Sequence, residues 1–128
     1  MSALRQLASF GLVGGLQLLL DWACFVSLTA AGMAVVPANL AGRIAGASLG
    51  FWLNGRVTFA RAGQPMLARR HLLRFLAFWI ATTAVSTLAM QAIDAREGLA
   101  TAWLLKPLVE ALLAALGFLA ARHWIYRP

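Results

Sequence analysis

A chain of 128 residues that is 62% hydrophobic and only 12% charged does not fit a soluble globule. Soluble domains are about half apolar and about a quarter charged, and a chain of this length has too small an interior to bury the excess apolar surface. The composition therefore predicts an integral membrane protein. It also makes nucleic-acid binding a poor explanation of the net charge of +7.

Four long apolar runs predict an all-α protein with four transmembrane helices in a single domain, residues 1–128. About 20 apolar residues cross the hydrocarbon core of a bilayer as a helix, and the first run reaches this length with only Gln17 and Asp21 interrupting it. A cleaved signal peptide is disfavoured because the run exceeds the apolar region of such peptides. The predicted spans are residues 7–30, 37–53, 72–93 and 99–121.

A basic loop over residues 54–71 is predicted between the second and third spans. The segment 54–74 contains five arginines and no acid, and the amino end and the tail add three more arginines. The connection between the third and fourth spans holds two acids and one arginine. Because positive residues in short loops stay in the cytoplasm, both termini and the basic loop are expected on the cytoplasmic side.

The two halves of the chain resemble each other. GFWLNGRVTF at 50–59 aligns with GFLAARHWIY at 117–126, and LRQLASF at 4–10 aligns with LRFLAFW at 73–79. Each half is then a hairpin that begins and ends on the same side, so the repeat is parallel, about an axis along the membrane normal. At the offset of the first alignment, Arg43 lies opposite Glu110 and Asn39 lies opposite Lys106. We expect these residues to share one interior.

Spacing supports a shared polar interior within each half. Asn39 and Arg43 are four residues apart, as are Lys106 and Glu110, and residues four apart lie on one face of a helix. Pro107 removes a backbone hydrogen bond to the carbonyl one turn earlier, which predicts a kink or an exposed carbonyl there. Glycines repeat every fourth residue in the second span, at 42, 46 and 50, and predict close contact between helices.

The intramembrane charges allow two interpretations. Ionisable residues inside a membrane are costly and are functional candidates by default, and Arg43 and Lys106 suit an anion while Asp21 suits a counter-charge or a proton site. Alternatively, two acids and two bases form an ion-pair cluster that only holds the helices together. Buried ion pairs often only break even against apolar packing, which favours the functional interpretation.

Arginines at the cytoplasmic ends of the second and fourth spans, Arg56 and Arg122, suit phosphate because the guanidinium presents a planar fork of donors. Ordinary binding of anionic lipid head groups is an equally good interpretation. No nucleophile–base arrangement, phosphate-binding loop or Cys/His cluster with metal-ligand spacing is present in the sequence. An enzyme is therefore not expected, and neither is a cofactor.

Taken in order along nearly the whole chain, these features resemble the GtrA-like family. The resemblance rests on four spans, Phe10–Gly14 ahead of Asp21, Asn39, the GFWLNGRVTF exit, RFLAF in the third span, Lys106 and the final FLAARHWIY. Members are small membrane proteins associated with cell-surface polysaccharide synthesis and O-antigen glucosylation. They are implicated in moving polyprenyl-phosphate-linked sugars from the cytoplasmic to the outer leaflet, beside the glycosyltransferase that makes them.

The resemblance implies flipping of a polyprenyl-phosphate-linked monosaccharide across the bacterial inner membrane. Arginines at the cytoplasmic mouth gather the phosphate, Arg43 and Lys106 receive it deeper, and the polar residues bond sugar hydroxyls or hold the cations in place. A dimer or larger assembly is expected because one four-helix unit has little room for such a path. The expected substrate-binding residues are Gln17, Asp21, Asn39, Arg43, Asn54, Arg56, Lys106, Glu110 and Arg122.

Two other functions remain open. The chain could anchor a glycosyltransferase without transporting anything, with its cytoplasmic arginines used for docking and its interior charges used for packing. A small multidrug-type antiporter with Asp21 as the coupling acid is less favoured, because two intramembrane cations repel a cationic drug.

Overall fold

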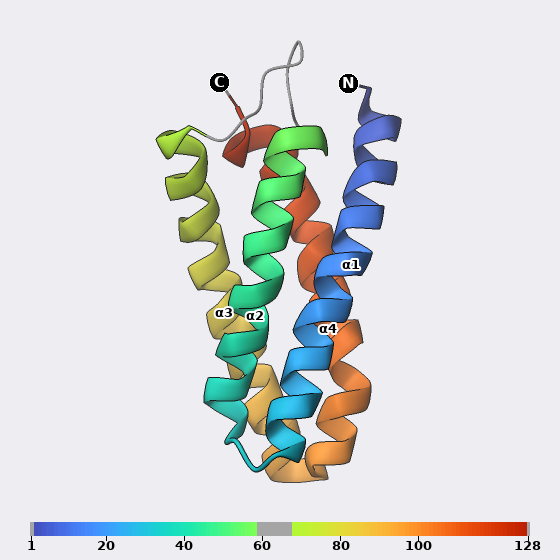
Figure 1. The fold of residues 1–128 in the computed structure, drawn as a ribbon, viewed down its shortest axis with the longest axis vertical. Helices are drawn as coiled ribbons and strands as arrows, with labels where there is room; N and C mark the ends of the chain where they lie inside the picture. The colour runs from blue at the N-terminus through green and yellow to red at the C-terminus, as the bar shows by residue number, and fades with distance from the viewer. Residues whose placement is uncertain (1, 59–67, 128) are drawn as a thin grey trace.

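The computed structural model describes residues 2–58 and 68–127 as an up-and-down bundle of four helices (Figure 1). The amino terminus, the carboxyl terminus and the exit of the second helix lie at one end of the bundle, here named the terminal end. Short turns join the helices at the opposite end. The elements are α1 (Ala3–Ala30), α2 (Val35–Leu53) with the π-helical turn η1 (Asn54–Thr58), α3 (Arg69–Glu97), and α4 (Leu99–Ala120) with the π-helical turn η2 (Ala121–Ile125).

The four helices contain the predicted apolar runs, but the predicted loop is too long. Its first residues continue α2 as η1, and α3 already begins at Arg69. Arg56 therefore lies on a helical turn, whereas Arg61 lies outside the described residues. In the described part of the chain, three helices are long and apolar enough to cross a membrane: α1, α3 and α4 with η2. The shorter α2 is not among them, since Asn39, Arg43 and its glycines reduce its hydropathy.

Polar and apolar residues are distributed as in a protein surrounded by lipid. Large apolar side chains face outward along the helices, with Leu104 77% exposed, while Lys106, Asn39 and Ser86 are fully buried. A soluble bundle has the opposite arrangement. Inside the bundle, the buried residues Phe25, Ala38, Met90 and Ala102 form an apolar cluster near the turns, and Ala121, Ile125 and Tyr126 form another at the terminal end.

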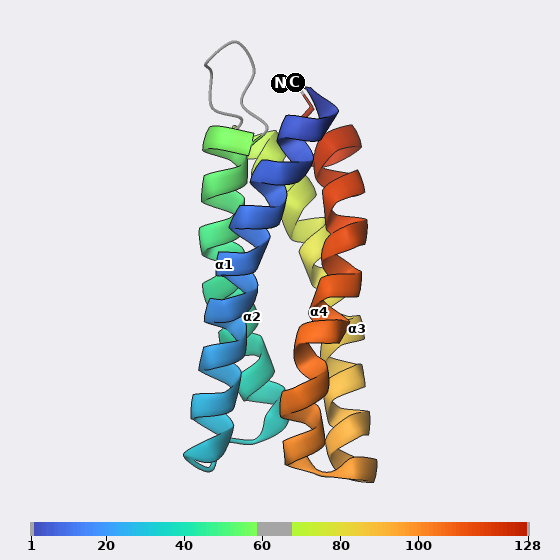
Figure 2. The same cartoon turned by 90° about the vertical axis from the view of Figure 1, so that its right-hand side faces the viewer.

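Close packing of α1 against α2 depends on the predicted glycines. A Cβ atom placed on Gly42 would lie 2.6 Å from the backbone oxygen of Asp21, and one on Gly46 would lie 2.9 Å from that of Gln17. Side chains larger than hydrogen therefore do not fit unless the helices separate. Figure 2 shows α1 running beside α2 along its length, and the prediction of glycine-mediated helix contact is confirmed.

Both hairpins end in a π-helical turn at matching positions of the repeat. Asn54–Thr58 corresponds to Ala121–Ile125 at the offset of the sequence alignment. The two ends are joined by Tyr126, whose hydroxyl donates to the backbone oxygen of Phe51 at 2.8 Å. His71 Nε2 donates to the Arg127 oxygen at 2.9 Å, and this bond fixes the carboxyl end against α3.

Candidate functional site

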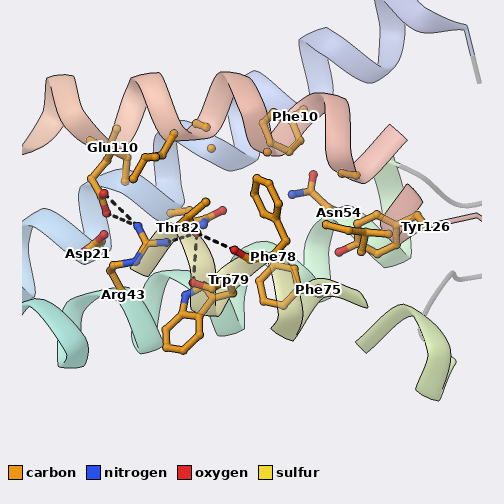
Figure 3. A pocket seen from close by; sticks show the side chains of 18 residues that line it. Phe10, Asp21, Arg43, Asn54, Phe75, Phe78, Trp79, Thr82, Glu110 and Tyr126 are labelled. Carbon is orange, nitrogen blue, oxygen red and sulfur yellow. Dashed lines mark hydrogen bonds and ion pairs between the residues drawn. The ribbon is translucent and has the colours of Figure 1, made fainter. Parts of the chain in front are cut away.

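A cleft runs inside the bundle from its middle to the terminal end (Figure 3). Its cavity volume is about 100 Å³, and all four helices contribute to its lining. Its inner end is polar and its outer end is mostly aromatic. The lining residues are Phe10, Gly14, Gln17, Leu18, Asp21, Arg43, Asn54, Phe75, Phe78, Trp79, Thr82, Glu110, Leu113, Ala114, Gly117, Ala121, Ile125 and Tyr126.

Arg43 on α2 and Glu110 on α4 form an ion pair at the inner end of the cleft. Arg43 Nη1 lies 2.7 and 3.0 Å from the two carboxylate oxygens. The other guanidinium nitrogens donate to α3, Nη2 to the Thr82 hydroxyl at 2.9 Å and Nε to the Thr83 hydroxyl at 2.8 Å. One side chain thus connects three helices, and all three guanidinium nitrogens donate hydrogen bonds (Figure 3).

Lys106 on α4 lies deeper and is fully buried. Its Nζ atom donates to Asn39 Oδ1 at 2.5 Å and to Glu110 Oε2 at 3.3 Å, and it lies 3.2 Å from Asp21 Oδ1. Asn39 in turn donates to hydroxyls on α3. We name Asp21, Asn39, Arg43, Lys106 and Glu110 the charge network.

The charge network confirms the pairing predicted from the internal repeat. Arg43 contacts Glu110, and Asn39 contacts Lys106. The network contains two acids and two bases, so it carries no net charge when all four are ionised. In this conformation its cations direct most of their N–H donors at protein acceptors.

Only part of the predicted substrate-binding set lines the cleft. Asp21, Arg43 and Glu110 form its inner end, and Gln17 and Asn54 lie along its wall. Lys106 and Asn39 lie behind this surface and hold the lining residues in place.

The two arginines expected at the mouth occupy separate places on the terminal end. Arg56 is exposed and its guanidinium carbon lies 5.3 Å from the centre of the Trp52 ring. Arg122 donates to the Gln6 side chain at 2.6 Å. Among the described residues, the structure brings neither into the lining of the cleft.

An aromatic wall of the cleft was not predicted from the sequence. Phe75, Phe78 and Trp79 line the cleft from α3, and Phe10 and Tyr126 line it from α1 and the carboxyl end. Composition alone does not separate these rings from an interfacial aromatic belt. A usable signal exists in their spacing, because residues 75, 78, 79 and 82 fall on one face of a helix.

The carbonyl that Pro107 leaves without a helical partner is not exposed. Proline has no N–H to bond the Trp103 oxygen one turn earlier, and the Trp22 indole N–H donates to that oxygen at 2.8 Å. The expectation that this carbonyl would be open to water or ligand is therefore wrong. The Trp22 contact joins α1 to α4.

Replacing Trp22 with phenylalanine is expected to destabilise the protein by about 1–3 kcal/mol, because the partly buried Trp103 oxygen loses its donor. Thermal unfolding in detergent measures the effect. Trp52→Phe is the matched control, since Trp52 is half exposed and its loss should change stability by only about 0.5 kcal/mol. Equal stability of the two variants would contradict the proposed role of Trp22.

Metal binding has no evident site in the described ranges 2–58 and 68–127, where no group of three or more His, Cys, Asp or Glu side chains could hold an ion.

Comparison with known proteins identifies the family. The family described as GtrA/DPMS, transmembrane domain, matches residues 9–126, which is nearly the whole chain. Comparisons with curated proteins and with solved structures gave no match. The match covers all four helices, the charge network and the cleft. The chain therefore belongs to the GtrA/DPMS transmembrane-domain family.

Proposed function

We propose that this protein moves a polyprenyl-phosphate-linked monosaccharide across the bacterial inner membrane, for glycosylation of cell-surface polysaccharide. Membership of the family implies a membrane protein involved in handling polyprenyl-linked sugars. Translocation of the lipid-linked sugar is what we propose beyond family membership. It requires no covalent chemistry, so the proposed activity is not enzymatic.

The observation that carries the proposal is a cleft with polar residues inside a bundle whose outer surface is apolar. A sugar head group is hydrated, and it crosses hydrocarbon only if polar groups replace its water. The cleft offers such groups at mid-depth, next to the charge network, while the prenyl tail can stay in the surrounding lipid. A protein that only anchors a partner has no use for an interior cleft.

The charge distribution supports a cytoplasmic position for the terminal end. Arg5, Arg74, Arg122 and Arg127 lie at this end, whereas Asp94 and Glu97 lie near the opposite turn. Positive residues in short loops remain cytoplasmic, so we propose that both termini are inside. The cleft would then open toward the leaflet in which the lipid-linked sugar is made. Association with the glycosyltransferase that supplies it, and assembly into a dimer or larger oligomer, stay predictions.

Transfer can be tested with a variant that fills the cleft. Gly117 lines the cleft, and a Cβ atom there would meet Phe78 and Phe10 only at ordinary contact distances of 3.6 and 3.8 Å. Gly117→Leu therefore places its side chain in the space proposed for the head group, and thermal unfolding checks that the variant is folded. Gly11→Leu is the matched control, because Gly11 is exposed on α1 and a Cβ atom added there would have no atom within 4 Å.

The measurement is transfer of a fluorescent short-chain polyprenyl-phosphate-hexose in proteoliposomes that contain only the purified protein, read with a membrane-impermeant reagent. The wild type and Gly11→Leu should accelerate transfer over empty liposomes, and Gly117→Leu should lower the rate about 10-fold, which is ~1.4 kcal/mol in the barrier. Rates equal to empty liposomes from folded wild-type protein would overturn the proposal. The glycosyltransferase-anchor function would then be favoured.

A further inference from the structure

Two buried oxygen atoms in the lining of the cleft have unused capacity to accept hydrogen bonds. Asn54 is 5% exposed, and its Oδ1 atom has no hydrogen-bond partner in the part of the chain that the structure describes. Asp21 Oδ1 is equally buried and lies 3.2 Å from Lys106 Nζ, but it too accepts no hydrogen bond of good geometry among the described residues. Buried polar groups are normally paired. Asp21 has Lys106 as an ion-pair partner, so the Asn54 oxygen is the atom that points to a missing donor.

Several donors around the cleft are already used within the protein. Arg43 donates to Glu110, Thr82 and Thr83, the Thr82 hydroxyl donates to backbone oxygens of its own helix, and the Tyr126 hydroxyl donates to the Phe51 oxygen. A group that donates to Asn54 Oδ1 would satisfy the acceptor that has no partner among the described residues. Sugar hydroxyls do so, whereas an ionised phosphodiester offers only acceptors.

Charge leads to the same conclusion. The charged residues that line the cleft are Asp21, Glu110 and Arg43, two acids and one base. Lys106, which balances the second acid, is buried behind them. A phosphate at the inner end would face two carboxylates in a region of low dielectric constant, where repulsion between like charges is strong.

The aromatic wall also suits a sugar ring. Phe75, Phe78 and Tyr126 line the outer half of the cleft together with Asn54 (Figure 3). The face of an aromatic ring carries partial negative charge and attracts the weakly positive C–H groups on one face of a pyranose. Such a wall gives a phosphate no comparable partner.

We propose that the cleft binds the sugar of the lipid-linked substrate as a hydrogen-bond donor, with Asn54 Oδ1 as a specificity-determining acceptor, and that the phosphate stays outside the cleft near the arginines of the terminal end. The proposal rests on the proposed function for the identity of the ligand. It reverses the expectation that Arg43 and Lys106 receive the phosphate.

The test compares three ligands with two proteins. The ligands are a short-chain prenyl-phosphate-hexose, a neutral alkyl hexoside with the same sugar, and the prenyl phosphate without sugar. The two sugar-bearing ligands are each made with glucose, with mannose and with galactose. The proteins are the full chain and Asn54→Leu, in a detergent without a sugar head group. Asn54→Leu removes an acceptor that has no described partner, so thermal unfolding should show a stability equal to or above that of the wild type.

Asn54→Leu should weaken binding of both sugar-bearing ligands about 10-fold, as for the loss of one buried hydrogen bond, and should leave the sugar-free phosphate unchanged. The preferred sugar is then tested in versions that each lack one hydroxyl. For the wild type, one of these deoxy sugars should bind about 10-fold more weakly than the complete sugar. For Asn54→Leu, the same deoxy sugar and the complete sugar should bind with equal affinity. This loss of discrimination identifies the hydroxyl that donates to Asn54.

Unchanged binding of every ligand to Asn54→Leu would overturn the inference and would mean that Asn54 contacts only water. An equal loss of affinity for the sugar-free prenyl phosphate would also overturn the inference, because Asn54 would then contact the phosphate or support the structure of the whole cleft. The transfer assay separates the two proposals. Asn54-dependent sugar binding without transfer contradicts translocation alone, and transfer with Asn54-independent binding contradicts this inference alone.

Discussion

Replacing Lys106 with methionine is expected to destabilise the protein by about 3–5 kcal/mol, the usual cost of leaving a buried charge without its partner. Lys106 is fully buried and contacts Asp21, Asn39 and Glu110. Methionine fills a similar volume but supplies no charge. The carboxylate of Asp21 then has no cation beside it, and Glu110 keeps only Arg43. Unfolding by heat or by a denaturing detergent measures the loss.

Restoring charge balance should recover much of the lost stability. In the double variant Asp21→Asn with Lys106→Met, the Arg43–Glu110 pair remains and carries no net charge. We expect the double variant to be more stable than Lys106→Met alone, with a coupling energy of about 1–3 kcal/mol in the double-mutant cycle. Additive effects of the Asp21 and Lys106 substitutions would contradict the ion-pair explanation.

The role of the charge network follows from these contacts. It joins α1, α2, α3 and α4 at mid-depth, so its stabilising role and its place at the inner end of the cleft are not alternatives. Substitutions within it change folding and binding together. This is why the transfer assay uses Gly117 and the binding assay uses Asn54, neither of which contributes a side chain to the network.

Long apolar runs and the internal repeat predicted the helices and the central contacts. A run of apolar residues needs no tertiary information to be recognised as a helix in a membrane. The offset between the two halves then identified the partners of Arg43 and Asn39, because related positions of a parallel repeat approach each other around the axis. The predicted loop was wrong at its edges because a π-helical turn continues α2 through polar residues that resemble a loop in sequence.

The cleft itself could not be predicted. Its shape depends on how rings such as Phe78 and Phe10 meet above Gly117, and on Trp22 taking up the oxygen that Pro107 leaves free. Both contacts connect residues far apart in the chain that no repeat or motif relates. Asn54 was a candidate for its place at a membrane exit, yet its unused acceptor is visible only when its neighbours are known.

Replacing Gly42 with alanine is expected to destabilise the protein by about 1–3 kcal/mol, the usual cost of overpacking an interior. Its Cβ atom would lie 2.6 Å from the Asp21 backbone oxygen and 2.5 Å from Asp21 Oδ1. Backbone cannot move aside as a flexible side chain can, so α1 must shift away from α2. The shift also displaces Asp21 from Lys106, and sugar binding should weaken in the same variant. Thermal unfolding and the hexoside titration measure the two effects.

Two other glycines provide controls that separate helix packing from helix propensity. Gly11 faces outward with no atom within 4 Å of an added Cβ, so Gly11→Ala should stabilise the protein by about 0.5–1 kcal/mol through helix propensity alone. At Gly50 the added Cβ meets the end of the flexible Gln17 side chain, which can rotate away. The stability of Gly50→Ala should therefore lie between those of Gly11→Ala and Gly42→Ala. If Gly42→Ala were as stable as Gly11→Ala, α1 and α2 would not be in the close contact described here. That result would also remove the reason for Asp21 to sit beside Lys106 at the inner end of the cleft.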